Sequence, residues 1–449
     1  MFRVSDVGTV SAYFTCRNRT VAVIATVVFV IGVTAAAARV ILQYQTPGPF
    51  DPSAQGMCDF HNGLYFPTRA LLRGTSPYGA EYAREYPVAR QIPFFSPAIL
   101  LLHAPLVVLP LHVAEVIYFT LSVFMLLGIA ALCCTAAGRA GQLEWIMSLA
   151  ALMVFSRPGH ITLFDGYFTF ELVLASFVAI HAARDRPWIA ALALVLVSAK
   201  PTYILPLGFL LLARGNLKAL LIGAVLSLVL AALPLGWLAY SESKRMTGAP
   251  DLVTGLQKIR SDVSEAQQVH MNMEDESPVE SWTRLDLLAS ICKFTGHEPS
   301  QLMHLLVMAG LLAVPMWVLF QRSRRGDDDG LGGATGALVS VMMLVSLYHQ
   351  SYDAMLLVAP LAGLACRRLT AWRQLGVSKR FAFGLLMLFP LFNYLTTRSI
   401  LSRLPLEREQ FLWITSLNGI VLGVLALLLL CETWGPAKQN APSTGRSAS

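Results

Sequence analysis

The stretch that decides the fold is TVAVIATVVFVIGVTAAAARVIL, residues 20–42, in which Arg39 is the single charged residue. A helix of about 20 apolar residues spans the roughly 30 Å hydrocarbon core of a bilayer. Unpaired backbone amides are costly in lipid, so such a run is a helix rather than a strand. It follows Arg17 and Arg19 and has no small-residue cleavage site. We therefore expect a retained transmembrane helix and not a cleaved signal peptide.

The composition extends this expectation to the whole chain of 449 residues. Apolar residues make up 55% and charged residues 14%, whereas an ordinary soluble domain has about 25% charged residues. The net charge of +7 lies mainly in short basic tracts between apolar runs, such as QRSRRG at 321–326. That distribution follows the positive-inside rule. We expect an all-α polytopic transmembrane protein with membrane lipids around it and no nucleic-acid partner.

The apolar runs predict about 12 transmembrane helices. They lie near residues 20–43, 96–111, 112–137, 143–158, 166–183, 187–213, 217–239, 301–320, 334–349, 352–367, 380–396 and 411–431. The run at 187–213 has Lys200-Pro201 in its middle, and proline interrupts a helix. A broken helix is therefore expected at this point.

Two segments are too long and polar to be simple turns, residues 44–95 and 240–300. The basic amino terminus is predicted to face the cytoplasm, which puts both segments on the extracytoplasmic side. The second segment reads as amphipathic or partly disordered. The expected organisation is a catalytic transmembrane module at 1–240 that includes the first loop, a second loop at 241–300, carboxy-terminal helices at 301–434 and a disordered tail at 435–449.

The cysteines have no metal-ligand spacing. Cys58 and Cys292 lie in the two polar segments, where they either form a disulfide in an oxidising compartment or remain two free thiols. The sequence has no Asp-x-Asp motif, glycine-rich phosphate loop or His/Cys cluster. We therefore expect no metal, no nucleotide-sugar site and no cofactor.

The first polar segment contains CDFHNGLYFPTRALLRGTSPYGAEY, which begins at Cys58. This string resembles the opening of glycosyltransferase family 87, membrane enzymes of the GT-C fold that take mannose from polyprenyl-phosphate mannose, such as the mycobacterial phosphatidylinositol-mannoside mannosyltransferase. The matching residues are Asp59, Phe60, Tyr65, Ala70, Gly74, Pro77, Tyr78, Phe95, Pro97 and the PLVVLP stretch at 105–110.

Two later stretches resemble the same family, SAKPTYILPLGFLLLARGNLKA from Ser198 and LYHQSYDAMLLVAP from Leu347. The resemblance thus recurs in order from about residue 55 to 360. One departure is FDGYFT at 164–169, where the family usually has Gly-Gln-x-Asn. The polar contact of that glutamine is therefore not expected in this chain.

The resemblance implies a multi-pass glycosyltransferase of the plasma (inner) membrane. It would transfer a hexose, foremost mannose, from a polyprenyl-phosphate sugar to a glycolipid or glycan acceptor on the extracytoplasmic face, with inversion. Asp59 is implied to be the general base, which accepts the proton of the attacking hydroxyl. Because a leaving phosphate needs no general acid, a single carboxylate is chemically sufficient.

Charges inside apolar runs mark candidate functional sites, because burying them in a membrane is costly. Lys200 is expected to bind the donor phosphate; alternatively it snorkels to the interface. His349 lies four residues before Asp353, with Tyr352 between them. His349 is expected to bind the phosphate, and Tyr352 and Asp353 the substrate; the alternative is a capped helix junction.

Weaker candidates lie elsewhere in the chain. Arg69 and Arg73 are four residues apart, so they share one face if that segment is helical. They would meet a phosphate or a lipid head group, or else are merely solvated. Phe60, Tyr65 and Tyr78 are expected to bind substrate through the resemblance. Four polar residues near apolar runs either line a cavity or are structural: His61, Glu115, Asp165 and Glu171.

Other functions stay open. A secondary transporter or lipid flippase also has many spans and intramembrane charges, but it usually shows paired repeats with short connecting loops. Two long polar segments on one face favour the enzyme. Transfer of a different sugar and a catalytically inactive assembly partner are further alternatives, and the presence of Asp59 argues against the second.

Overall fold

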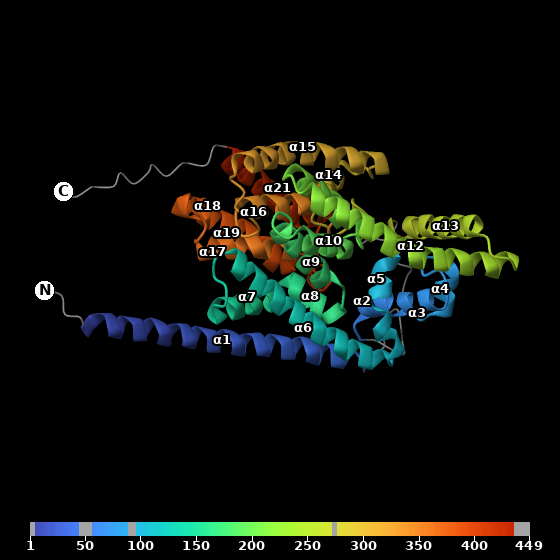
Figure 1. Cartoon of the computed structure of the whole chain (residues 1–449), viewed down its shortest axis with the longest axis horizontal. Helices are drawn as coiled ribbons and strands as arrows, with labels where there is room; N and C mark the ends of the chain where they lie inside the picture. The colour runs from blue at the N-terminus through green and yellow to red at the C-terminus, as the bar shows by residue number, and fades with distance from the viewer. Residues whose placement is uncertain (1–4, 45–55, 89–95, 272–275, 435–449) are drawn as a thin grey trace.

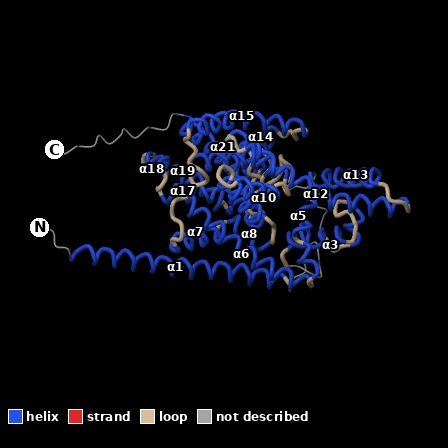
Figure 2. The backbone as a smooth tube through the Cα atoms, in the orientation of Figure 1, coloured by secondary structure: helices blue, strands red, loops and turns tan. Residues whose placement is uncertain are grey.

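The computed structural model describes residues 5–44, 56–88, 96–271 and 276–434. The tail at 435–449 and Phe95 lie outside these residues. Apart from one isolated β-bridge between Arg284 and Gln350, the regular structure of the described residues is helical (Figure 2). The expectation of an all-α protein is confirmed.

Five helices are long and apolar enough to cross a membrane: α1 (Ser5–Gln43), α6 (Leu111–Ala136), α12 (Leu217–Thr247), α15 (Gln301–Arg325) and α21 (Arg408–Trp434). A sixth candidate span is the pair α7 (Leu143–Phe155) and α8 (Arg157–Asp165), which is bent by 72°. In Figure 1, α1 and α15 lie along opposite sides of the molecule. Their exposed apolar side chains, such as Ile31 and Leu306, suit a lipid environment.

Shorter elements fill the space between the long helices. They are α9 (Thr169–Ala182), α10 (Pro187–Val197), α11 (Pro201–Ala213), α16 (Ala334–Ser346), η3 (Ser351–Leu357), α17 (Val358–Cys366), α18 (Thr370–Gln374), α19 (Val377–Phe392), η4 (Tyr394–Thr396) and α20 (Arg398–Leu401). Every residue of α16 is buried. Most of these elements are too short to span a bilayer, so twelve full-length spans are not confirmed.

The run at 187–213 is broken where its proline predicts. Lys200 has extended backbone angles, φ −120° and ψ 108°, and Pro201 is the first residue of α11. Proline is suited to this position because its missing N–H has no helical partner there. The break turns Lys200 away from the lipid and into the protein, where its side chain is 6% exposed.

The expectation of one helix at 96–111 is wrong. This stretch forms two short elements, α5 (Pro97–Leu102) and the 3₁₀ helix η2 (Ala104–Val108). Pro105 and Pro110 cannot donate backbone hydrogen bonds, which prevents a continuous α-helix here.

Both polar segments contain helices. The first forms α2 (Cys58–Phe60), the π-helical turn η1 (His61–Tyr65), α3 (Phe66–Leu72) and α4 (Ala80–Glu85), and the second holds the end of α12, α13 (Leu252–Met271) and α14 (Leu287–Thr295). The helix α13 packs along α12 at one end of the molecule (Figure 1). The end of α12 is hydrogen-bonded to the first segment. Glu242 Oε1 accepts from Ser76 N at 2.6 Å, and Arg245 Nη2 donates to Gly74 O at 2.9 Å.

Cys58 and Cys292 are both free thiols. Cys58 Sγ lies 3.8 Å from Asp165 Oδ1, and Cys292 is on α14, which packs against α21. A disulfide between the two polar segments is therefore contradicted, and contacts such as those of Glu242 and Arg245 hold the segments in place instead.

Gly166 allows the end of α8 to pack closely against α2. It ends α8 in the left-handed region, with φ +74°, and a Cβ atom there would lie 2.8 Å from Phe60 Cβ and 2.7 Å from Met57 Cε. The close approach of α2 to α8 thus requires glycine.

We predict that Gly166→Ala lowers thermal stability and displaces α2. Gly141 is the matched control, because it has φ +69° but no neighbouring atom within 4 Å of the place that a Cβ atom would occupy. Gly141→Ala is expected to cost about 1 kcal/mol through backbone strain alone, and Gly166→Ala about 1–3 kcal/mol more through overpacking. Thermal unfolding in detergent measures both; equal losses would contradict the packing argument.

Candidate active site

A buried ion pair lies at the centre of the candidate site. Lys200 Nζ is 3.2 Å from Asp353 Oδ2, and both side chains are nearly inaccessible to solvent. Their positions come from the break before α11 and from the first turn of η3. Two charges taken out of water are tolerated only when they are paired and hydrogen-bonded.

Three further donors satisfy the Asp353 carboxylate. Tyr203 donates its hydroxyl to Oδ1 at 2.6 Å, His349 Nδ1 contacts Oδ2 at 3.0 Å, and the Gln350 backbone N–H donates to Oδ2 at 3.0 Å. His349 is fully buried, and its Nε2 has no hydrogen-bond partner among the described residues. The residues predicted around His349 and Lys200 are thus in direct contact.

Aromatic rings surround the Lys200 ammonium. The ring centroids of Tyr167, Tyr203 and Tyr352 lie 5.4, 5.2 and 5.1 Å from Nζ. Tyr167 and Tyr352 also pack against each other, with ring centroids 4.7 Å apart. Such faces stabilise a cation, so the ammonium is held from one side by a carboxylate and from others by tyrosine rings.

Asp59 lies on α2. Tyr167 is within electrostatic range of both Asp59 and Asp353, and Asp59 is half-buried. Asp59 is also within electrostatic range of Asp165, which Cys58 contacts. The turn FDGYFT therefore brings Asp165 and Tyr167 next to the predicted base.

A polar network anchors α2 to α6. Glu115 Oε1 accepts from Met57 N at 2.8 Å and makes a short contact with His61 Nε2, while Glu115 Oε2 is 2.7 Å from His112 Nδ1. His61 and Glu115 are buried. His61 and Glu115 therefore have a structural role: they hold the turn on which Asp59 lies.

Several predicted substrate ligands lie in the packed core. Phe60 is fully buried and stacks on Tyr118 at 4.7 Å. Tyr65 donates its hydroxyl to Leu109 O at 2.7 Å, and Tyr78 is 4% exposed. Their role in substrate binding stays a prediction, while their packing shapes the first polar segment.

Arg69 is not part of the buried cluster. It lies on α3 and is half-exposed, and among the described residues no hydrogen bond or ion pair joins its guanidinium to a protein group. Arg73 follows at the end of the same helix and is exposed. A role for Arg69 at a phosphate stays a prediction.

An apolar pocket of about 630 Å³ lies between η2, α6, α9 and α10. Its walls include Leu102, Leu121 and Leu192. Its polar end is Glu171, whose Oε1 accepts from Tyr118 at 2.9 Å and contacts His103 Nε2 at 3.0 Å. Tyr118, which lines the pocket, stacks on Phe60, the residue that follows Asp59 in the chain.

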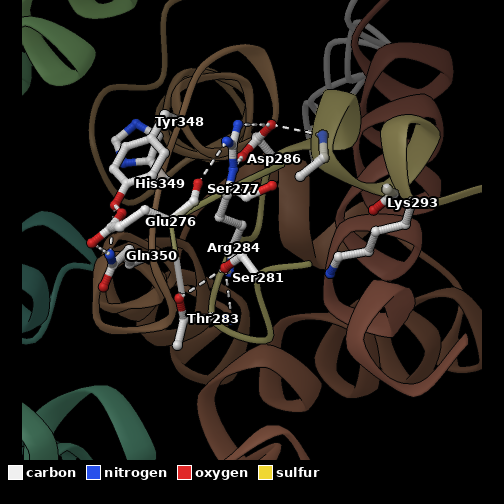
Figure 3. A network of polar contacts seen from close by, with 12 residues as sticks. Glu276, Ser277, Ser281, Thr283, Arg284, Asp286, Lys293, Tyr348, His349 and Gln350 are labelled. Carbon is white, nitrogen blue, oxygen red and sulfur yellow. Dashed lines mark hydrogen bonds and ion pairs between the residues drawn. The ribbon is translucent and has the colours of Figure 1, made fainter. Parts of the chain in front are cut away.

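The second polar segment contacts the residues around His349 (Figure 3). Leu285 N donates to His349 O at 2.8 Å, and Arg284 forms a bidentate ion pair with Asp286, at 2.9 and 3.0 Å. Burial alone would raise the pKa of Asp286, but the Arg284 guanidinium holds that pKa below its usual value. The pair therefore stays charged, with Asp286 capping α14 through Ala289 N.

Sequence reasoning missed three residues of the site. Tyr203 and Tyr167 contact the buried pair, and Glu276 contacts Tyr348 and Gln350. Tyr203 is three residues after Lys200, on the same helical face, and this spacing is a usable signal. Glu276 lies in a mixed charged stretch that resembles solvated surface.

The fold and the site define a helical membrane protein with a charged, aromatic-lined centre enclosed by short helices and two polar segments. The chain belongs to glycosyltransferase family 87, whose family model matches residues 94–346, more than half of its length. It is therefore a glycosyltransferase. Lys200 lies within the matched stretch, Asp59 precedes it, and His349 and Asp353 follow it. No curated protein and no solved structure matches the chain.

We predict that Lys200→Met destabilises the protein by about 3 kcal/mol, because Asp353 is left buried without its cation. The double variant Lys200→Met/Asp353→Asn is expected to recover part of this loss. Lys218→Met is the control, since Lys218 is exposed. Thermal unfolding in detergent measures all three, and a Lys200→Met protein as stable as the control would contradict the ion pair.

Proposed function

We propose that the protein transfers a hexose, foremost mannose, from a polyprenyl-phosphate sugar to a hydroxyl group of a glycan or glycolipid acceptor. Asp59 is the general base. The observation that carries this proposal is the position of Tyr167, whose ring centroid lies 5.4 Å from Lys200 Nζ and which is within electrostatic range of Asp59. A candidate proton acceptor and a candidate phosphate-binding cation thus both lie near one aromatic residue.

In the proposed reaction, the acceptor oxygen attacks the anomeric carbon from the side of Asp59. The bond from that carbon to the phosphate oxygen breaks as the new glycosidic bond forms, and the anomeric configuration inverts. The hydroxyl proton passes to the Asp59 carboxylate. Polyprenyl phosphate leaves with an additional negative charge.

Lys200 and His349 are proposed to bind the donor phosphate. The Lys200 ammonium is held by Asp353 and three tyrosine rings, so it is preorganised for the charge that develops on the leaving group. His349 Nδ1 is fixed on Asp353, and its buried Nε2 is without a partner among the described residues. A phosphate oxygen is a suitable acceptor for that nitrogen when it is protonated.

The apolar pocket behind Phe60 supports a lipid-linked donor. Its volume of about 630 Å³ and its leucine-rich walls suit part of a prenyl chain, which enters sideways from the bilayer. The basic amino terminus supports an extracytoplasmic site, because positive charge favours the cytoplasmic side. Tyr352 beside Lys200 is proposed to contact the sugar.

We predict that Asp59→Asn abolishes transfer while leaving the protein folded. Loss of a general base lowers rate by about 10²–10⁴-fold. The assay follows consumption of radiolabelled polyprenyl-phosphate mannose by membranes containing the protein, without an ion gradient. Asp185→Asn, in an exposed turn, is the matched control and is expected to be fully active.

Full activity of the Asp59→Asn protein would exclude this carboxylate as the base. Consumption of a different polyprenyl-phosphate sugar in preference to the mannose donor would keep the reaction and change the sugar. Transport that depends on an ion gradient, with no donor consumed, would instead identify a transporter.

A further inference from the structure

Glu276 is a buried carboxylate that the proposed reaction does not use. It lies in the second polar segment and is 2% exposed. Its Oε1 accepts from Gln350 Nε2 at 2.8 Å, and its Oε2 accepts a short hydrogen bond from the Tyr348 hydroxyl (Figure 3). The segment after it is held separately, by the contact of Leu285 with His349 and by the Arg284–Asp286 pair.

Gln350 connects Glu276 to the ion pair. The Asp353 backbone N–H donates to Gln350 O at 2.9 Å and also faces the Gln350 side chain, while the Gln350 backbone N–H donates to Asp353 Oδ2 at 3.0 Å, so the two residues form a capping box at the start of η3. A side-chain amide has one donor end and one acceptor end. Gln350 Nε2 donates to Glu276 Oε1 and also to the Tyr348 hydroxyl at 2.5 Å, so the acceptor end of Gln350 faces Asp353.

The chemistry of Glu276 fits this role. An ionised carboxylate accepts hydrogen bonds at both oxygens and donates none, so it can receive both Tyr348 and Gln350. A glutamine at 276 has a single acceptor oxygen, and its amide would direct a donor at one of these two groups. If that amide donates to Tyr348, the Tyr348 hydroxyl can no longer donate to residue 276, so the hydrogen bonds among the three side chains must rearrange and hold Gln350 less firmly.

We propose that Glu276 is a positioning residue for the donor-phosphate site. It orients the Gln350 amide, which fixes Asp353, and Asp353 in turn fixes Lys200, Tyr203 and His349. This inference rests on the proposed function of Lys200 and His349. Glu276 itself does not touch the substrate.

The test measures binding of decaprenyl phosphate to the full-length protein in detergent by isothermal titration calorimetry. Glu276→Gln is expected to weaken binding about tenfold, which corresponds to about 1.4 kcal/mol. Gln350→Ala is expected to weaken it similarly. Because both act by one route, the double variant Glu276→Gln/Gln350→Ala should bind no more weakly than Gln350→Ala alone.

Glu280→Gln is the matched control, since Glu280 lies four residues further along the same segment and is more accessible than the buried Glu276. Glu276→Asp is measured alongside; it keeps the charge but is too short to reach both partners, so it should also weaken binding. Elution as a single species and the unfolding temperature establish that each variant is folded. A purely structural role would reduce the folded fraction and leave the affinity of the folded protein unchanged.

Wild-type affinity in folded Glu276→Gln protein, or additive effects in the double variant, would overturn the inference alone. If the wild-type protein does not bind decaprenyl phosphate, the proposed function is overturned together with it. The two failures are therefore distinguishable.

Discussion

The Lys200–Asp353 ion pair is the constraint around which the candidate site is built. An ammonium and a carboxylate removed from water are stable only if they remain paired and fully hydrogen-bonded. This requirement joins the start of α11 to the first turn of η3, and it accounts for the hydrogen bonds of Tyr203, His349 and Gln350 to one carboxylate. The short helices around the pair are consistent with a membrane interior built to surround polar groups rather than to span the bilayer repeatedly.

The two polar segments are hydrogen-bonded to each other and to the helices around the candidate site. The first contains α2, which carries Asp59. Glu115 anchors α2 through Met57 N, and Gly166 allows α2 to pack closely against the end of α8. The second reaches the other side of the site through Glu276 and the backbone around His349. Their direct link is the end of α12, where Glu242 and Arg245 bind the turn at 74–76. These hydrogen bonds hold the two segments together without a disulfide, and Cys58 and Cys292 are free thiols.

Local signals made part of this site predictable from sequence. A lysine followed by proline inside an apolar run predicts a break, and the placement of Lys200, His349 and Asp353 in or beside apolar runs predicts a polar site within the protein. Both occur in the structure. The pairing of Lys200 with Asp353 joins residues 153 positions apart, which no local pattern encodes. The sequence does not distinguish the buried carboxylate of Glu276 from a solvated one. Nor does it distinguish short buried helices from full spans, because both are uniformly apolar.

The central claim of the proposed function is that the substrates bind in a single cavity, where Lys200 holds the phosphate of a polyprenyl-linked sugar and Asp59 faces its anomeric carbon. A cryo-electron microscopy structure with bound polyprenyl phosphate tests this most directly. The claim predicts phosphate oxygens within hydrogen-bonding distance, about 2.7–3.2 Å, of Lys200 Nζ and His349 Nε2, with Asp59 facing the same cavity. A phosphate bound away from these two nitrogens, or an Asp59 side chain outside that cavity, would contradict it.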